Sequence, residues 1–163
     1  MKKLYVDDAQ IREYVNKISY QMYKDNWRPD YIVGIGRGGL VPANLLSQYT
    51  GIKMNSLDIS LRDGGDCVSN LGMAEDAYAG KKILVVDDIN DQGSTVAWIK
   101  QDWPSGCFPN DEKWQSIWGD NVRFAVLTHN QSSQFKDPDY YAWTVNKAEE
   151  DCWLVYPWED FWL

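Results

Sequence analysis

The chain has 163 residues, of which 44% are hydrophobic, so it can bury one substantial core, and we expect a single domain over residues 1–163. Its net charge of −8 argues against a surface that binds nucleic acid, and no apolar run is long enough to span a bilayer. The three cysteines lacks the spacing of a zinc site, and acidic residues follow Lys3 before a signal-peptide core could form, so we expect a reducing cytoplasmic setting.

Patterns in the first half of the chain predict helix, strand, turn, helix and strand. Residues 5–26 repeat apolar side chains at helical spacing, with Asp7 or Asp8 as the N-cap and Pro29 as a stop signal. The stretch "DYIVGIGRGGLVPANLLSQYTG" predicts a strand, a glycine turn and a helix that Gly51 ends. Residues 53–61 predict another strand. Residues 62–82 are polar and contain glycine, so we expect a long surface loop there.

The second half of the chain continues the alternation. Strands are expected over residues 82–89, 120–130 and 139–145, a helix over residues 94–103, and a tryptophan-rich tail after the last strand. Short β-branched strands that alternate with helices imply an α/β fold, a mostly parallel twisted sheet with helices on both faces. Ligands of such sheets bind beyond the carboxyl ends of the strands. Both glycine-bearing turns should therefore open at one edge, on a single cleft.

Three carboxylates, Asp87, Asp88 and Asp91, fall within five residues in "ILVVDDINDQGST". In most proteins, two acids after a strand only form a solvated turn or a helix cap. Here they precede a second glycine turn that leads directly into a helix and consists of Gln92, Gly93, Ser94 and Thr95. The amides and hydroxyls of such a turn suit a phosphate monoester, and the neighbouring acids suit ribose hydroxyls or Mg²⁺. The stretch therefore predicts a ribose-5-phosphate site.

The same stretch resembles the 5-phosphoribosyl 1-diphosphate (PRPP) signature of type I phosphoribosyltransferases, in which an apolar strand, two acids and a third acid precede Gly and Thr. Gln92 stands where the signature usually has Thr. The resemblance implies that Asp87, Asp88, Asp91 and the second glycine turn bind PRPP. It also implies that Asp88 binds Mg²⁺ as the cofactor and that Asp91 is the catalytic base, which accepts a proton from the acceptor base.

A first glycine turn lies in "GIGRGGLVPA", whose spacing does not match the GxGxxG of dinucleotide-binding folds. Taken alone, it is as well explained by an ordinary tight turn. With an arginine between glycines it suits a diphosphate, because glycine lets backbone amides approach an anion closely. The stretch resembles the pyrophosphate loop of the xanthine-guanine phosphoribosyltransferases. The resemblance implies that Arg37, Gly38 and Gly39 bind PRPP and that the Gly36–Arg37 peptide is cis.

The tail "DCWLVYPWE" is similar to the base-binding hood of that family, which would be formed mainly by about residues 131–163. The resemblance implies that Trp153 stacks on the purine and that backbone groups at Leu154 read its edge. Without the resemblance, a core or interface role for Trp153 would be the better interpretation.

The sequence departs from the family at two places. Asn130, next to His129, takes the position of a lysine that contacts the exocyclic oxygen of the purine. We expect Asn130 to contact the base, and its lack of charge favours hypoxanthine or guanine over xanthine. We assign no catalytic role to His129. In the mobile loop (residues 62–78), Arg62 is present but Val68 stands where the family has a second arginine.

The expected reaction is transfer of the phosphoribosyl group from PRPP to a 6-oxopurine base. Two alternatives stay open: a non-catalytic regulator that keeps a PRPP pocket, and a phosphoribosyltransferase for a different nitrogen base. The expected partners are PRPP and a purine base, with no nucleic acid and no membrane. Family members commonly assemble, so we expect a homodimer or homotetramer, and an interface could be lined by Trp103, Trp114, Trp118, Trp158 and Trp162.

Overall fold

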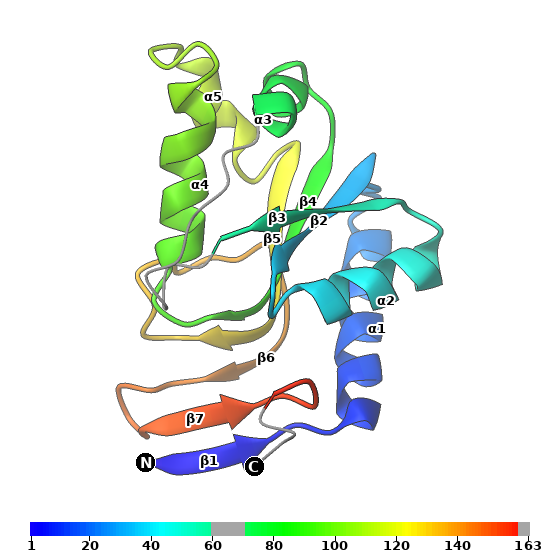
Figure 1. Cartoon of the computed structure of the whole chain (residues 1–163), viewed down its shortest axis with the longest axis vertical. Helices are drawn as coiled ribbons and strands as arrows, with labels where there is room; N and C mark the ends of the chain where they lie inside the picture. The colour runs from blue at the N-terminus through cyan, green and yellow to red at the C-terminus, as the bar shows by residue number, and fades with distance from the viewer. Residues whose placement is uncertain (60–70, 160–163) are drawn as a thin grey trace.

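The computed structural model describes residues 1–59 and 71–159, and its centre is a five-stranded parallel sheet (Figure 1). The strand order is β3-β2-β4-β5-β6, and every neighbouring pair is parallel. The strands are β2 (Tyr31–Gly36), β3 (Met54–Asp58), β4 (Ile83–Asn90), β5 (Val122–Asn130) and β6 (Tyr140–Val145). Each of them overlaps a strand that the sequence predicts, and the predicted parallel α/β fold is confirmed.

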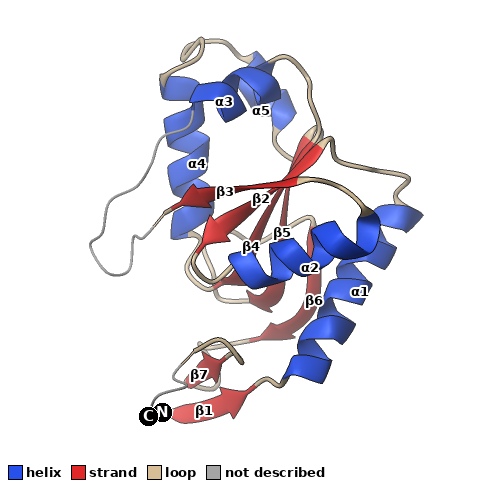
Figure 2. Ribbon diagram, turned by 45° about the vertical axis from the view of Figure 1, so that its right-hand side comes forward, coloured by secondary structure: helices blue, strands red, loops and turns tan. Residues whose placement is uncertain are grey.

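Helices cover both faces of this sheet, as predicted (Figures 1 and 2). One face packs against α1 (Asp8–Lys24) and α2 (Leu40–Thr50), and the other packs against α3 (Leu71–Tyr78), α4 (Ser94–Ser105) and α5 (Lys113–Ile117). Alternate residues of β4 divide between the two cores: Leu84 and Val86 enter one, and Ile83 and Val85 enter the other. None of the helices described here has the length and apolar character needed to cross a bilayer.

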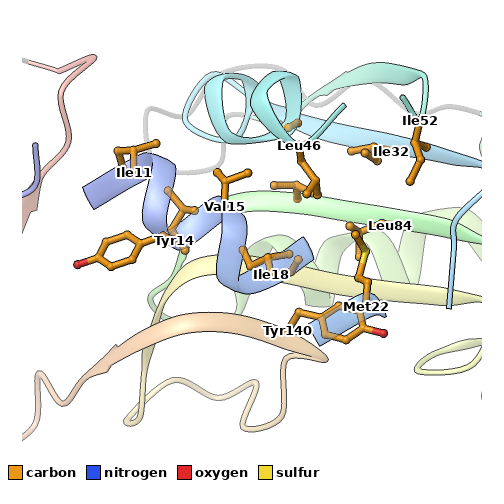
Figure 3. Close-up of a cluster of buried hydrophobic side chains, with 14 of the residues drawn as sticks. Ile11, Tyr14, Val15, Ile18, Met22, Ile32, Leu46, Ile52, Leu84 and Tyr140 are labelled. Atoms are coloured by element: carbon orange, nitrogen blue, oxygen red, sulfur yellow. The ribbon is translucent and has the colours of Figure 1, made fainter. Parts of the chain in front are cut away.

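Helix α1 forms because its sequence supplies both a cap and one apolar face. Asp7 accepts a hydrogen bond from the Gln10 amide at 2.8 Å, and the Gln10 side chain accepts one from the Asp7 amide at 2.9 Å. This capping box fixes the helix start at the predicted position. The buried face points at α2 and the sheet, and Figure 3 shows Val15 and Ile18 of α1 beside Leu46 of α2.

Two short helices were not expected from the sequence. Residues 71–78 fall within the stretch predicted to be a surface loop, but they form α3, which buries Met73, Ala74 and Ala77. The prediction of a loop was wrong because two of the three buried side chains are alanines, which give a weak apolar signal among polar neighbours. Helix α5 is shorter still, with 5 residues. Residues 62–70, including Arg62 and Val68, lie outside the described residues.

A separate two-stranded parallel sheet joins the two ends of the chain (Figures 1 and 2). It pairs β1 (Lys2–Tyr5) with β7 (Cys152–Val155), with Lys3 opposite Trp153. Strand β1 was not predicted, because its 4 residues are mostly exposed and carry no alternating apolar pattern. The tail therefore has a backbone partner that comes from the first residues of the chain.

The tryptophans expected at an interface are partly core residues. Trp103 and Trp114 have only 1% and 4% of their surface exposed and pack between α4, α5 and the sheet. Trp118 is partly buried and stacks on Trp114, with ring centroids 5.5 Å apart. The interface prediction is therefore wrong for Trp103 and Trp114. Trp162 lies outside the described residues.

Candidate active site

The two glycine turns lie at the same edge of the sheet. Strands β2 and β4 are neighbours, with Gly34 opposite Val86. The chain passes from β2 to β3 on one side of β2 and then returns to β4 on its other side. The strand order therefore changes direction between β2 and β4, where parallel sheets commonly bind ligands. The expectation that both turns open at one edge is confirmed.

The first glycine turn touches the end of β4 directly. A Cβ added to Gly38 would lie only 2.6 Å from the Cγ of Asp88, and one added to Gly39 would lie 2.9 Å from the Cα of Asp87. Only glycine permits this approach. The Gly36–Arg37 peptide is cis, as the resemblance implies, and the side chain of Arg37 is exposed. A guanidinium in this position can pair with a bound anion.

The second glycine turn presents the start of α4 to the same edge. Gly93 has a φ of +85° and no side chain caps the helix there, so the first amides of α4 are available to an anion. The turn is supported from behind: a Cβ on Gly93 would lie 2.7 Å from the backbone nitrogen of Phe135 and 3.2 Å from the Ser133 hydroxyl. The loop after β5 therefore fixes the position of this turn.

A buried polar network connects that loop to β4 and β5. The Asn90 amide nitrogen donates to the Phe135 carbonyl at 2.6 Å and lies 3.1 Å from His129 Nδ1, while Ser133 donates to the Asn90 oxygen at 2.8 Å. Because a carbonyl can only accept, the amide orientation is fixed, and His129 Nδ1 must accept from Asn90. Burial lowers the pKa of His129, although a backbone hydrogen bond at Lys136 acts in the opposite direction. His129 is therefore a neutral structural residue.

Asp88 lies at the centre of the site and is only 7% exposed. Its carboxylate faces the first glycine turn and accepts a hydrogen bond from the Ile89 amide at 2.8 Å. The Tyr156 hydroxyl lies 2.7 Å from the Thr128 hydroxyl and donates to the Asp88 carbonyl at 3.2 Å. Burial, aided by the negative charge of Asp88, holds the pKa of Tyr156 well above its usual value. Tyr156 is thus a neutral donor that fixes the end of β4.

Asp91 pairs with a lysine that sequence reasoning missed. The Lys147 ammonium lies 3.1 Å from Asp91 Oδ1 and 5.4 Å from the centre of the Trp153 ring. Lys147 follows β6, in a stretch of mixed charge that gives no local signal of a site. The sequence led us to expect an uncharged base site because Asn130 occupies the position of the family's lysine. The structure corrects this expectation, since a cation reaches the same region from another strand.

Asn130 is used inside the protein rather than exposed to a ligand. Its amide nitrogen donates to the Asp91 carbonyl at 2.8 Å and to Asp91 Oδ1 at 3.3 Å. Its oxygen accepts from the Lys147 amide at 3.0 Å and from Ser132. Both amide hydrogens and the oxygen thus have partners, and only 4% of the residue is exposed. The prediction that Asn130 contacts a base is therefore corrected: Asn130 positions Asp91 and Lys147.

A pocket lies between the end of β4 and the two-stranded sheet. Its lining brings together residues predicted separately for the sugar, the catalytic base and the purine, and it includes Asp88, Asp91, Lys147, Trp153, Leu154 and Tyr156. The first glycine turn adjoins this pocket through Asp88. The arrangement can hold a phosphorylated sugar across the two turns and a flat ring against β7.

A parallel sheet with two glycine turns at its switch point defines a phosphate-binding α/β domain. The chain belongs to the phosphoribosyltransferases: the family model described as the phosphoribosyl transferase domain matches residues 5–159.

Individual relatives agree with this family. A hypoxanthine-guanine phosphoribosyltransferase of Schizosaccharomyces pombe is 25% identical over 167 residues, which cover 83% of this chain and 79% of that protein. A xanthine-guanine phosphoribosyltransferase of Idiomarina loihiensis is 25% identical over 132 residues, covering 78% of this chain and 70% of the relative. The crystal structure of a purine phosphoribosyltransferase from Pyrococcus horikoshii superimposes with a TM-score of 0.68 at 24% identity, covering 100% of this chain and 97% of the other. This last similarity supports the fold.

Proposed function

We propose that the protein transfers the 5-phosphoribosyl group of PRPP to N9 of a 6-oxopurine, forming a nucleoside 5′-monophosphate and diphosphate. The observation that carries the proposal is the position of Asp91, which lines one pocket together with Asp88 and Trp153. An acid in this position lies between the second glycine turn and a ring-binding surface. The names of the two curated relatives support purine bases as the acceptors.

In this proposal the two glycine turns bind opposite ends of PRPP. Arg37 and the amides of Gly38 and Gly39 bind the diphosphate, and residues 92–95 bind the 5-phosphate at the start of α4. Asp87 and Asp88 bind the ribose hydroxyls between them. Negative charge grows on the diphosphate as its bond to C1′ breaks, and Arg37 stabilises that charge.

The acceptor base occupies the pocket beside β7. Its ring stacks on Trp153, and backbone groups at Leu154 contact its edge. The lone pair of N9 forms the new bond to C1′, the electron pair of the broken bond leaves with the diphosphate, and Asp91 accepts the proton that N7 loses. Asn130 keeps Asp91 in place through its bonds to the backbone and carboxylate of that residue.

Mg²⁺ is the proposed cofactor, with Asp88 as its ligand. Over residues 1–59 and 71–159, no group of three or more His, Cys, Asp or Glu side chains is arranged to hold a metal by itself. Adjacent acids at a phosphate-binding edge fit Mg²⁺, which commonly takes one or two carboxylates and completes its shell with substrate oxygens and water. When bound, the ion would neutralise charge on the diphosphate.

The test is release of diphosphate from PRPP and Mg²⁺ with hypoxanthine, guanine, xanthine, adenine or uracil as the acceptor. We expect turnover with 6-oxopurines. Asp91→Asn should lower kcat about 100- to 10,000-fold, the usual contribution of a general base, while PRPP binding is retained. Glu13→Gln is the matched control, because Glu13 also pairs with a lysine, Lys17, but lies on α1. No turnover with any base would favour a PRPP-binding regulator, and turnover with uracil alone would overturn the purine assignment.

The same proposal covers assembly and setting. We propose a cytoplasmic homodimer or homotetramer, as the family resemblance implies. Light scattering coupled to size-exclusion chromatography would measure the mass directly, and a monomeric mass would overturn this part of the proposal.

A further inference from the structure

The wall of the base pocket carries a carboxylate and an ammonium side by side. Asp91 Oδ1 and Lys147 Nζ are 3.1 Å apart, and both residues line the pocket. The side chain of Asp91 is 35% exposed and that of Lys147 is 18% exposed, so both are partly shielded from water but remain accessible to a ligand. The pocket therefore offers one hydrogen-bond acceptor and one charged donor at a fixed separation.

Internal contacts hold this pair in place. Asn130 accepts a hydrogen bond from the Lys147 amide and donates to Asp91, so one buried side chain positions both members. The Lys147 ammonium also lies over the Trp153 ring at 5.4 Å from its centre, where the ring attracts a cation. A ring that stacks on Trp153 would thus have its edge next to the pair.

The edge of a 6-oxopurine is complementary to the pair. N7 and O6 are neighbours on one edge of the ring system, and in the tautomer that reacts through N9 they are a donor and an acceptor. Asp91 can accept from N7–H while Lys147 donates to O6, so each residue exchanges its contact with the other for one with the base. Adenine has an amino donor instead of O6, and an ammonium has no lone pair to accept from it.

We propose that Lys147 is a specificity-determining residue, which selects 6-oxopurines by donating a hydrogen bond to O6 while Asp91 accepts from N7–H. This inference rests on the proposed transferase function and assigns it an acceptor class through a named side chain. It requires that a large part of the preference for hypoxanthine over a purine without O6 comes from Lys147.

The experiment measures kcat/KM for hypoxanthine and for unsubstituted purine, which lacks O6, with the wild type, Lys147→Met and Lys147→Arg. A lost charged hydrogen bond should lower kcat/KM of Lys147→Met for hypoxanthine about 10- to 100-fold more than for purine. Lys147→Arg keeps the charge and should retain part of the preference. Lys17→Met is the control, because Lys17 also pairs with a carboxylate and lies over a ring, Tyr14, but is on α1.

The outcomes separate this inference from the proposed function. If Lys147→Met loses the same factor with both bases, Lys147 only supports Asp91, and the inference is overturned while the transferase assignment stands. If the wild type uses purine as well as hypoxanthine, O6 is not recognised, and the inference fails without reference to any variant. Absence of turnover with every base overturns the transferase function and the inference with it.

Discussion

Gly38→Ala tests whether the two glycine turns really share one edge. The added Cβ would lie 2.6 Å from the Asp88 Cγ, well inside the 3.4 Å at which ordinary contact begins. The turn has little room to retreat, because Gly39 is equally close to the backbone of Asp87. The buried carboxylate of Asp88 must therefore move, and it is the proposed ligand of Mg²⁺.

The size of the effect follows from these contacts. Overpacking of a buried site usually costs about 1–3 kcal/mol. For a domain of this length each kcal/mol lowers Tm by about 2–4 °C, so we expect a Tm about 2–12 °C below that of the wild type. Displacement of a binding group by about 1 Å can lower activity about 100-fold, and we expect a loss of this order in kcat/KM for PRPP.

The assay combines thermal unfolding with steady-state kinetics at varied PRPP. Gly106→Ala is the matched control: the only atom close to its added Cβ is the flexible end of Leu71, at 3.2 Å. We expect this control to retain wild-type kcat/KM. A folded Gly38→Ala protein with wild-type kcat/KM for PRPP would refute the idea that the first turn and Asp88 bind one ligand together.

Three further predictions concern the surroundings of the site. Tyr156→Phe should lower the free energy of unfolding by about 1–3 kcal/mol in urea titrations, because it leaves the Asp88 carbonyl and the Thr128 hydroxyl without their buried partner. Since burial lowers the pKa of His129, the unfolded chain binds the proton more tightly, and stability present above pH 6.5 should be lost as the pH falls below that value, less so in His129→Gln. Trp153→Ala should raise KM for the purine about 5- to 100-fold, the range for a lost stacking contact, with KM for PRPP changed little.

Each of these has its own contradiction. Tyr23 is 82% exposed, so Tyr23→Phe should leave stability unchanged, and an equal effect of Tyr156→Phe would disprove the buried hydrogen-bond network. Equal acid sensitivity of the wild type and His129→Gln would mean that His129 is not the group that titrates. Unchanged KM for the purine in Trp153→Ala would remove the stacking role.

The sequence predicted the sheet well because its central strands are buried on both faces. Strands β2 and β4 are nearly continuous apolar runs, and each is followed by glycine, so both strands and turns are visible locally. Helix α3 has no such signal, since small side chains form its buried face. Strand β1 is recognisable only from its pairing with β7 at the other end of the chain.

The candidate site divides in the same way. The acids and the second glycine turn are consecutive in the sequence, so their proximity needs no knowledge of the fold. Lys147 reaches Asp91 only because β5 and β6 lie side by side with β4 in the sheet, which brings the loop after β6 to the end of β4. Asn130 was recognised as a site residue, but its role depends on three-dimensional contacts that spacing does not reveal.

The most direct test is a crystal structure of the protein with Mg²⁺ and PRPP in the absence of a base. We predict the diphosphate against Arg37, Gly38 and Gly39, the 5-phosphate on the amides of residues 93–95, and the ribose beside Asp87 and Asp88. Phosphate groups bound away from either turn, or a PRPP molecule that contacts only one of them, would contradict a single substrate held across neighbouring strand ends.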